Sequence, residues 1–139
     1  MPRVSHGEDV PVATIVVTAA VIERDGRLLL TRRLKGAHLE GCWEFPGGKC
    51  DAGESLAGCL VRELREELDV DARVGAELFA TTHAYPDRRV ELHFFACELL
   101  GEPTPLLGQT MRWIARGELA SLQFAPADAR LIAALTRPA

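Results

Sequence analysis

The sequence predicts a mixed α/β fold, because stretches typical of strands alternate with two stretches typical of helices. Residues 12–23 and 27–33 are apolar runs of strand length, and Asp25 and Gly26 between them are a strong signal for a tight hairpin turn. Residues 55–68 carry leucine at every fourth position, which is typical of an amphipathic helix. These three observations already place a helix after an antiparallel pair of strands.

The other elements are predicted further along the chain. They are an extended piece at 43–45, strands at 73–82, 89–100 and 111–114, and a final amphipathic helix at 127–136. Pro46 ends the extended piece because proline cannot donate to a strand ladder, whereas Pro126 lies near a helix start, where proline is tolerated. At 139 residues and 47% hydrophobic, the chain suits a single domain, residues 1–139, with a core from about residue 12 to residue 136.

Composition excludes several classes of partner. The net charge is −4 without a basic block, which argues against nucleic-acid binding driven by backbone phosphates. The apolar run at 12–22 is too short to cross a bilayer, and the first ten residues lack the apolar core of a signal peptide. We therefore expect a cytoplasmic protein with no membrane or nucleic-acid partner. The cysteines, which form no C-x-x-C pair and are expected to be free thiols, are Cys42, Cys50, Cys59 and Cys97.

Three glutamates of the predicted helix lie where ordinary solvated charges would not. At about 100° per residue, Glu67 and Glu63 fall roughly 20° and 60° from the centre of the leucine stripe, and Glu66 about 120° from it. Arg62 and Arg65 are predicted on the opposite side of the helix. Because unpaired carboxylates at an apolar edge are costly, we expect a cation against this edge, and carboxylate oxygens favour Mg²⁺ or Mn²⁺.

The helix belongs to a longer pattern, since residues 47–70 resemble the Nudix box, G-x5-E-x7-R-E-U-x-E-E-x-G-U, in which U is aliphatic. The matching positions are Gly48, Glu54, Arg62, Glu63, Leu64, Glu66, Glu67 and Val70. Similar charged runs are common on solvated helices, so the two glycines and Glu54 at the family spacing make the match specific. Asp69 stands where the family has glycine; aspartate adopts the left-handed conformation readily, so we expect a cost of up to about 1 kcal/mol in stability rather than lost chemistry.

The likeness extends over roughly residues 12–135 and is closest to MutT-type nucleoside triphosphate pyrophosphohydrolases. It rests on residues 31–33, 37–38, 44–49, 86–88, 101–103 and 125–128. The resemblance implies the Nudix α/β/α sandwich with a mixed β-sheet. It also implies Mg²⁺-dependent hydrolysis of a (deoxy)nucleoside triphosphate to the monophosphate and pyrophosphate, in house-cleaning of the nucleotide pool. The substrates it suggests are 8-oxo-dGTP or a CTP- or dCTP-like nucleotide.

The same resemblance implies residue roles. Catalytic roles fall to Glu54, Glu63, Glu66 and Glu67, and the last three with the Gly47 carbonyl would hold the cation, while Glu54 pairs with Arg62. Substrate contacts fall to Arg33, His38, Phe45, Lys49, Tyr85 and Asp128. Arg33 and Lys49 suit phosphate oxygens, and Phe45 and Tyr85 could flank the base. Structural alternatives remain open: a surface charge at Glu54, a solvated strand end at Arg33, a core position for each aromatic residue, and no substrate contact at His38.

Asp128 bears on the choice of base. The matching position is often asparagine, which both donates and accepts, whereas an ionised aspartate only accepts. Ionised Asp128 should favour a base that presents an amine, such as cytosine; burial could keep it protonated and admit 8-oxoguanine. The alternative is a favourable charge at the start of the last helix.

Leu107 departs from the family more seriously, because MutT-type enzymes often carry a metal-linked glutamate just before the pair found here as Gly108 and Gln109. The number of cations therefore stays open, as do the oligomeric state and the preferred base. Two further functions also stay open. One is hydrolysis of another nucleoside diphosphate derivative, and the other is a non-catalytic nucleotide-binding Nudix module.

Overall fold

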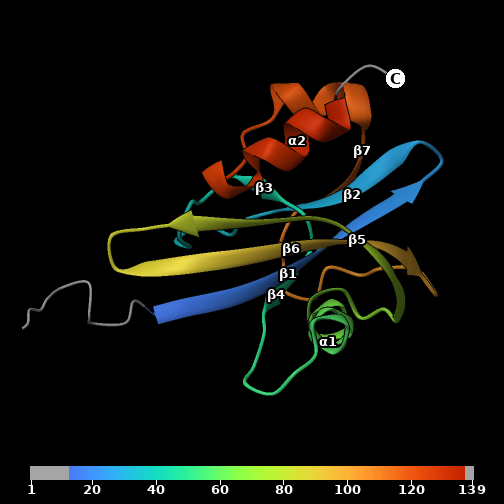
Figure 1. Cartoon of the computed structure of the whole chain (residues 1–139). Coiled ribbons are helices and arrows are strands. Elements are labelled where there is room, and N and C mark those ends of the chain that lie inside the picture. Colours follow the sequence, from blue (N-terminus) through green and yellow to red (C-terminus); the bar gives the residue numbers. More distant parts are fainter. Residues whose placement is uncertain (1–12, 137–139) are drawn as a thin grey trace, which may run out of the picture.

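A computed structural model, which describes residues 13–136, contains a mixed β-sheet with helices on both faces (Figure 1). The strands are β1 (Ala13–Arg24), β2 (Arg27–Arg32), β3 (Trp43–Glu44), β4 (Gly47–Lys49), β5 (Ala72–Ala84), β6 (Arg88–Leu99) and β7 (Met111–Ala115). The helices are α1 (Leu56–Leu68) and α2 (Ala129–Thr136), with the 3-10 helices η2 (Arg116–Ser121) and η3 (Pro126–Asp128). The predicted α/β/α sandwich is confirmed.

Strand β1 organises the sheet, whose order is β3-β2-β1-β6-β5. It pairs in parallel with β6 from Ala13 to Ile22 and antiparallel with the short strand β4, while β7 pairs with β2. At its end β1 turns through Asp25 and Gly26 into β2, which confirms the predicted hairpin. The parallel pair makes the sheet mixed, because parallel neighbours need a crossover that here contains α1 and β5.

The central strands are buried on both faces, and alternate residues supply two separate cores. Leu28 and Leu30 pack into the core beneath α2, whereas Leu29 between them packs into the core beneath α1. Phe94 and Phe95 of β6 divide in the same way. This follows from the two-residue period of a strand, and each fully buried leucine contributes about 1.5–3 kcal/mol to stability.

Several element bounds differ from the prediction. Strand β4 and helix η2 were not predicted, because Gly47–Lys49 has no apolar periodicity and its extended form depends on pairing with β1. The last helix begins at Ala129 rather than at residue 127, since Pro126–Asp128 forms a separate 3-10 turn. Strand β5 continues to Ala84, beyond the predicted end at residue 82. The predicted beginning of the first strand, residue 12, lies outside the described residues.

Candidate active site

Helix α1 is fixed against the sheet by its apolar stripe and by both of its ends. Its fully buried side chains are Cys59, Leu60, Leu64 and Leu68. The Gly58 N–H donates to the Ser55 hydroxyl at 3.0 Å, so Ser55 is the N-cap of the helix. Asp69 adopts the left-handed conformation (φ 51°, ψ 45°) and its N–H donates to the Arg65 carbonyl at 3.1 Å, so aspartate performs the capping role that the family gives to glycine. The glutamates are thereby held on a rigid support.

Strand β4 packs so closely against β1 and against the Glu63 side chain of α1 that a Cβ at either of its glycines would force a neighbour to move. A Cβ on Gly47 would overlap the backbone oxygen of Thr18 on β1, and a Cβ on Gly48 would overlap the carboxyl group of Glu63. The two glycines therefore let β4 lie in the sheet while the Glu63 carboxylate lies directly over its backbone. This explains physically why two glycines precede the glutamate helix.

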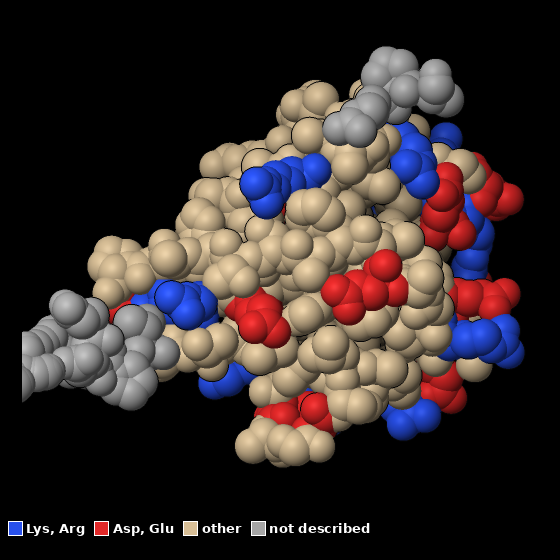
Figure 2. All heavy atoms as spheres, in the orientation of Figure 1, with Lys and Arg blue, Asp and Glu red and all other residues tan. Residues whose placement is uncertain are grey.

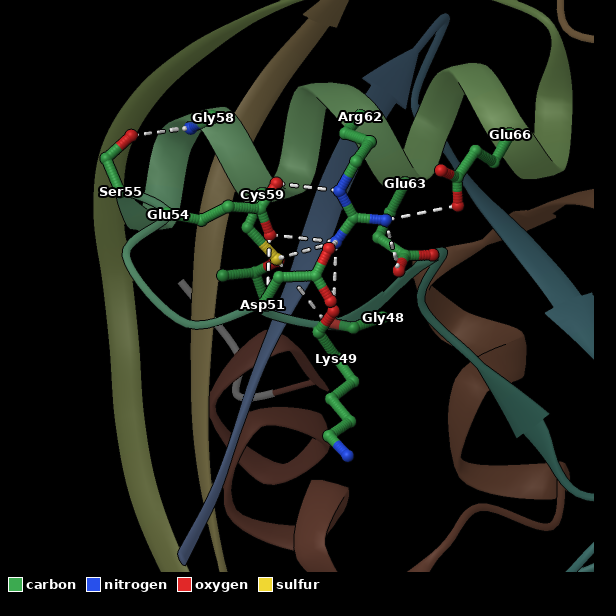
Figure 3. A network of polar contacts seen from close by, with 11 residues as sticks. Gly48, Lys49, Asp51, Glu54, Ser55, Gly58, Cys59, Arg62, Glu63 and Glu66 are labelled. Atoms are coloured by element: carbon green, nitrogen blue, oxygen red, sulfur yellow. Dashed lines mark hydrogen bonds and ion pairs between the residues drawn. The ribbon is translucent and has the colours of Figure 1, made fainter.

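Arg62 connects three glutamates, Glu54 before helix α1 and Glu63 and Glu66 on it, through hydrogen bonds (Figure 3). Its guanidinium forms a fork with Glu54, at 2.7 Å and 2.9 Å, and its Nη1 lies 3.1 Å from both Glu63 and Glu66. A further bond, at 3.1 Å, goes to the Lys49 carbonyl. The predicted pairing of Glu54 with Arg62 is confirmed. The predicted placement of Arg62 on the far side of the helix is wrong, because its long side chain turns back to the glutamates.

The Arg62 fork also sets the charge of Glu54. The pKa of Glu54 is lowered to about 2, first by the hydrogen bonds from Arg62 and then by the backbone N–H of Asp51, which donates at 2.8 Å. The hydrogen bonds to Glu54 and then to Glu66 in turn raise the pKa of Arg62. Glu54 is therefore ionised at neutral pH and acts as a fixed anchor for Arg62 rather than as a proton carrier.

Glu63 and Glu67 are two neighbouring carboxyl groups whose pKa values are raised, in contrast to the lowered pKa of Glu54. Burial raises the pKa of both carboxyl groups. The pKa of Glu67 reaches about 8, first because of burial and then because of the negative charges of Glu63 and Glu44. A backbone hydrogen bond with Gly47 offsets only part of this effect. Among the described residues, Glu67 has no lysine or arginine within ion-pair distance. The pair thus retains a proton at a position where positive charge would be stabilised.

The donor chemistry of this edge fits a hard divalent cation. Carboxylate oxygens are its preferred ligands, and a cation would relieve the repulsion that now raises the Glu67 pKa. In residues 13–136, no three acidic, histidine or cysteine side chains converge into a complete cation site. Glu66, the third predicted ligand, is bonded to Arg62 instead. The Glu63–Glu67 pair is therefore the part of the predicted ligand set that the fold already brings together.

One cleft of about 330 Å³ collects the predicted substrate contacts. The six residues Arg33, His38, Phe45, Lys49, Tyr85 and Asp128 all line it. Gly47 and Glu67 line the same cleft, so the cation edge and the candidate nucleotide site are continuous. Glu44 and Arg88 also line it. Both lie in segments that carry the family resemblance, 44–49 and 86–88, but no role was predicted for either, because each lies in an ordinary strand context.

Arg33 and Glu44 form the charged wall of this cleft. The Arg33 Nη1 lies 2.9 Å from the Glu44 carboxylate, and its Nε donates to the His38 carbonyl, so Arg33 also orders the 33–42 loop. Burial raises the pKa of Glu44, and Arg33 partly offsets this. The solvated strand end considered for Arg33 is therefore not what the fold provides.

The aromatic residues divide into two groups. Phe45 is 4% exposed and contacts Phe94 edge-on and Phe124 face-on, so it is a core residue whose surface closes the cleft. Tyr85 lies at the rim, with its ring centroid 6.5 Å from that of His38. The Arg88 guanidinium lies 5.8 Å from the Tyr85 ring, and its buried Nε has no hydrogen-bond partner among the described residues. This unpaired donor is available to a substrate acceptor.

Asp128 is 7% exposed and comes from η3, just ahead of α2. Its pKa is raised to about 7, first by burial and then by the negative charge of Glu44, with Arg33 acting in the opposite direction. Asp128 does lie at the start of the last helix, as the alternative of a favourable charge there requires, but it is buried and also lines the cleft. Near neutral pH, Asp128 exchanges between an acceptor and a donor within the cleft.

Leu107 lies beside the cation edge but contributes no ligand. It is 55% exposed and lines a second cleft, of about 210 Å³, with Glu44 and Glu67. The Leu107 N–H donates to the Gln109 side chain at 2.9 Å, and the Gln109 amide donates to the Glu67 carbonyl at 3.3 Å. Gln109 therefore attaches this loop to the end of α1, with Leu107 near the glutamates.

Glutamates gathered on one helix edge beside an arginine-lined cleft are typical of hydrolases that use a divalent cation to cleave phosphoric anhydrides. Residues 17–134 match the family model described as NUDIX domain, and the chain belongs to this family. It is therefore a Nudix hydrolase, and members of the family generally use a divalent metal.

Curated relatives and solved structures agree with this assignment. A CTP pyrophosphohydrolase of Escherichia coli K12 is 38% identical over 121 residues, covering 86% of this chain and 90% of the relative. An 8-oxo-dGTP diphosphatase of Haemophilus influenzae is 40% identical over 121 residues, covering 85% and 88%. The solution structure of the E. coli ORF135 protein superposes with a TM-score of 0.79 at 36% identity, covering 92% of this chain and 96% of that protein.

Two surface properties complete the description. Within residues 13–136, no helix is long and apolar enough to cross a membrane. On the face seen in Figure 2, basic and acidic side chains are interspersed rather than gathered into one basic surface. That distribution agrees with a small charged substrate handled inside a cleft.

Proposed function

We propose that this Nudix hydrolase converts a nucleoside triphosphate to the monophosphate and pyrophosphate in a Mg²⁺-dependent reaction, acting on the cytoplasmic nucleotide pool. The observation that supports this most is that two acidic residues line one cleft: Asp128, which can bond to a nucleobase, and Glu67, which can bind a cation. Arg33 and Lys49 line it as well and supply positive charge for phosphate oxygens. The net charge of −4 makes these local cations necessary for an anionic substrate.

The proposed roles of the glutamates follow from their partners. Glu63, Glu67, Glu66 and the Gly47 carbonyl would hold the cation, which when bound neutralises phosphate charge and favours ionisation of the attacking water. Glu67 would also receive a proton from that water, because it is the one of the three glutamates that lines the substrate cleft. Arg62, fixed by Glu54, would position Glu63 and Glu66 for ligation.

For the base, we propose a cytosine nucleotide as the preferred substrate. Glu44 and Asp128 line the cleft and lie near enough for Glu44 to raise the Asp128 pKa, so together they present carboxylate oxygens that accept from an exocyclic amine. The similar relatives bear both names, CTP pyrophosphohydrolase and 8-oxo-dGTP diphosphatase, at nearly equal identity. The choice therefore depends on the cleft rather than on the relatives.

One observation favours 8-oxo-dGTP as a second candidate. With a pKa of about 7, Asp128 is substantially protonated at neutral pH and can then donate to a carbonyl oxygen. The same side chain would thus accept from cytosine above pH 7 and donate to 8-oxoguanine below it.

A hydrolysis panel tests both statements. CTP, dCTP, 8-oxo-dGTP and the ordinary triphosphates are each incubated with Mg²⁺, and pyrophosphate and phosphate are measured separately. Release of pyrophosphate, with the highest kcat/KM for CTP or dCTP, is the expected result. Release of phosphate alone, or activity confined to nucleoside diphosphate derivatives, would contradict the proposed reaction; a kcat/KM highest for 8-oxo-dGTP at every pH would contradict the proposed base.

A further inference from the structure

Two cysteines face each other across the contact between β4 and α1. Gly48 faces Glu63, because the position of its missing side chain points at that carboxyl group. Cys50 is two residues further along the extended chain and Cys59 is one helical turn before Glu63. Two strand residues advance about 6.6 Å and one helical turn about 5.4 Å, so Cys50 stands opposite Cys59 as Gly48 stands opposite Glu63.

The contacts of the two residues agree with this placement. Cys50 continues the β4 pairing, since its N–H donates to the Val16 carbonyl at 2.8 Å. The Cys59 thiol lies 3.3 Å from the Thr18 hydroxyl and 3.8 Å from the Gly48 carbonyl. Burial and the neighbouring Cys59 thiol raise the pKa of Cys50 to about 12. Both residues are free thiols, and they lie at the contact between β4 and α1.

Access to the pair is from one side only. Cys59 is fully buried, whereas Cys50 is partly exposed and lines a surface groove of about 460 Å³ together with Glu54 and residues of β1 such as Thr14. This groove is distinct from the substrate cleft, although Lys49 borders both. An oxidant that enters the groove therefore meets Cys50 first, with Cys59 behind it.

We propose that Cys50 and Cys59 are a modification site that a peroxide converts to an intramolecular disulfide. Because its pKa is raised, Cys50 is almost entirely a protonated thiol at neutral pH, so the reaction proceeds slowly there, through the small thiolate fraction. This thiolate attacks the peroxide oxygen, the O–O bond breaks, and Cys50 becomes a sulfenic acid with release of water or an alcohol. The Cys59 thiolate then attacks the sulfenic sulfur, and the S–O bond breaks with release of water. In total, two thiols lose two electrons and two protons, and the peroxide is reduced by the same two electrons.

The disulfide would act on the helix edge that carries Glu63 and the other proposed cation ligands. It would tie residue 50 to a helix position one turn from Glu63, at the contact where Gly48 lies beneath that carboxyl group. Drawing the end of β4 towards α1 tightens a contact that already has no room for a Cβ, so it shifts Glu63 and the Arg62 bonds that hold it. Turnover should fall at least severalfold in the oxidised protein and recover on reduction.

The experiment treats the full chain with hydrogen peroxide, blocks remaining thiols, and maps disulfides by peptide mass spectrometry. The expected product is a Cys50–Cys59 linkage that has lost two hydrogen atoms and is reversed by dithiothreitol. Because the thiolate is the attacking species, its formation should accelerate at least about tenfold between pH 7 and pH 9. Cys50→Ser should abolish the linkage, whereas Cys97→Ser, which removes another partly exposed thiol, should not.

The mapping does not depend on the proposed substrate, so its failure is distinguishable from a failure of the proposed reaction. A Cys50 that proceeds to sulfinic acid, or a linkage between any other cysteines, would refute the pair. A mapped Cys50–Cys59 linkage with unchanged turnover would refute the proposed effect of the disulfide on Glu63. Should Cys59→Ala not fold, Cys50→Ser alone still decides the question, because Cys50 lies at the groove surface.

Discussion

Replacement of Glu67 by glutamine should have opposite effects on activity and on stability. The substitution keeps the size of the side chain and removes its charge, so the proposed cation loses a ligand and the attacking water loses its base. We expect turnover to fall at least about a hundredfold, which corresponds to about 2.7 kcal/mol of transition-state stabilisation. The fold should remain intact because α1 is held by its buried leucines rather than by this carboxylate.

The stability effect follows from the pKa of the same group in the cation-free protein. A folded pKa of about 8, against an ordinary value of 4.5, means that folding favours the protonated form. No penalty exists below pH 4.5; it grows as the pH rises and is complete above pH 8. The gap sets a ceiling of about 5 kcal/mol, but Glu67 shares the penalty with Glu63 and is partly exposed, so about 1–2 kcal/mol is the expected gain for the variant at pH 9.

The assay is urea denaturation with a chelator present, at pH 4 and at pH 9, for the parent, Glu67→Gln and Glu66→Gln. Glu66 has a side chain that is 58% exposed, so its variant is the stability control and should follow the parent at both values. Adding Mg²⁺ should stabilise the parent and leave Glu67→Gln nearly unchanged. Equal stability of parent and Glu67→Gln at pH 9, or turnover within threefold of the parent, would refute this interpretation of Glu67.

Three further predictions concern the base, the loop and the anchor. Asp128→Asn should change the kcat/KM ratio between CTP and 8-oxo-dGTP at least about tenfold, the scale of one mismatched hydrogen bond; an unchanged ratio would show that Asp128 does not read the base. Leu107→Glu should tighten Mg²⁺ binding in calorimetry, because the loop lies beside Glu67, and unaltered affinity in a folded variant would mean that the side chain points elsewhere. Glu54 has a pKa of about 2, so the stability it contributes is present above pH 4.5 and is lost as the pH falls towards 2; Glu54→Gln should flatten this part of a thermal-midpoint profile, and a profile that retains the parent slope would contradict the Arg62 anchor.

The fold was largely predictable because its strands and helices carry their own periodicity. Leu28, Leu29 and Leu30 alternate between two cores, and their continuous apolar run is the pattern typical of a strand buried on both faces. The α1 leucines recur every four residues, which is typical of a helix with one buried face. Strand β4 could not be predicted in the same way, since two glycines have no side-chain pattern. Its extended form comes from pairing with β1, which lies some thirty residues earlier in the chain.

The candidate site was predictable as a set of residues but not as a set of contacts. Spacing placed Glu63 and Glu67 on one edge of α1, but the helical wheel treats side chains as short radial vectors. Arg62 is long enough to return to that edge, and nothing in the local sequence states that it does. Glu44 raises the pKa of both Glu67 and Asp128, and this proximity exists only after β3 has paired with β2.

The distribution of partners along α1 identifies which glutamate carries the unmet charge. Arg62 is a single cation shared among several acceptors; its two shortest bonds go to Glu54, and longer ones reach Glu63 and Glu66. Glu67 is not bonded to Arg62; burial raises its pKa most, and the nearby charges of Glu63 and Glu44 raise it further. A structure that needed only a stable helix would place an apolar residue at this half-buried position. The carboxylate at Glu67 costs stability in the cation-free protein, and it makes physical sense as the position where a divalent cation completes the charge balance.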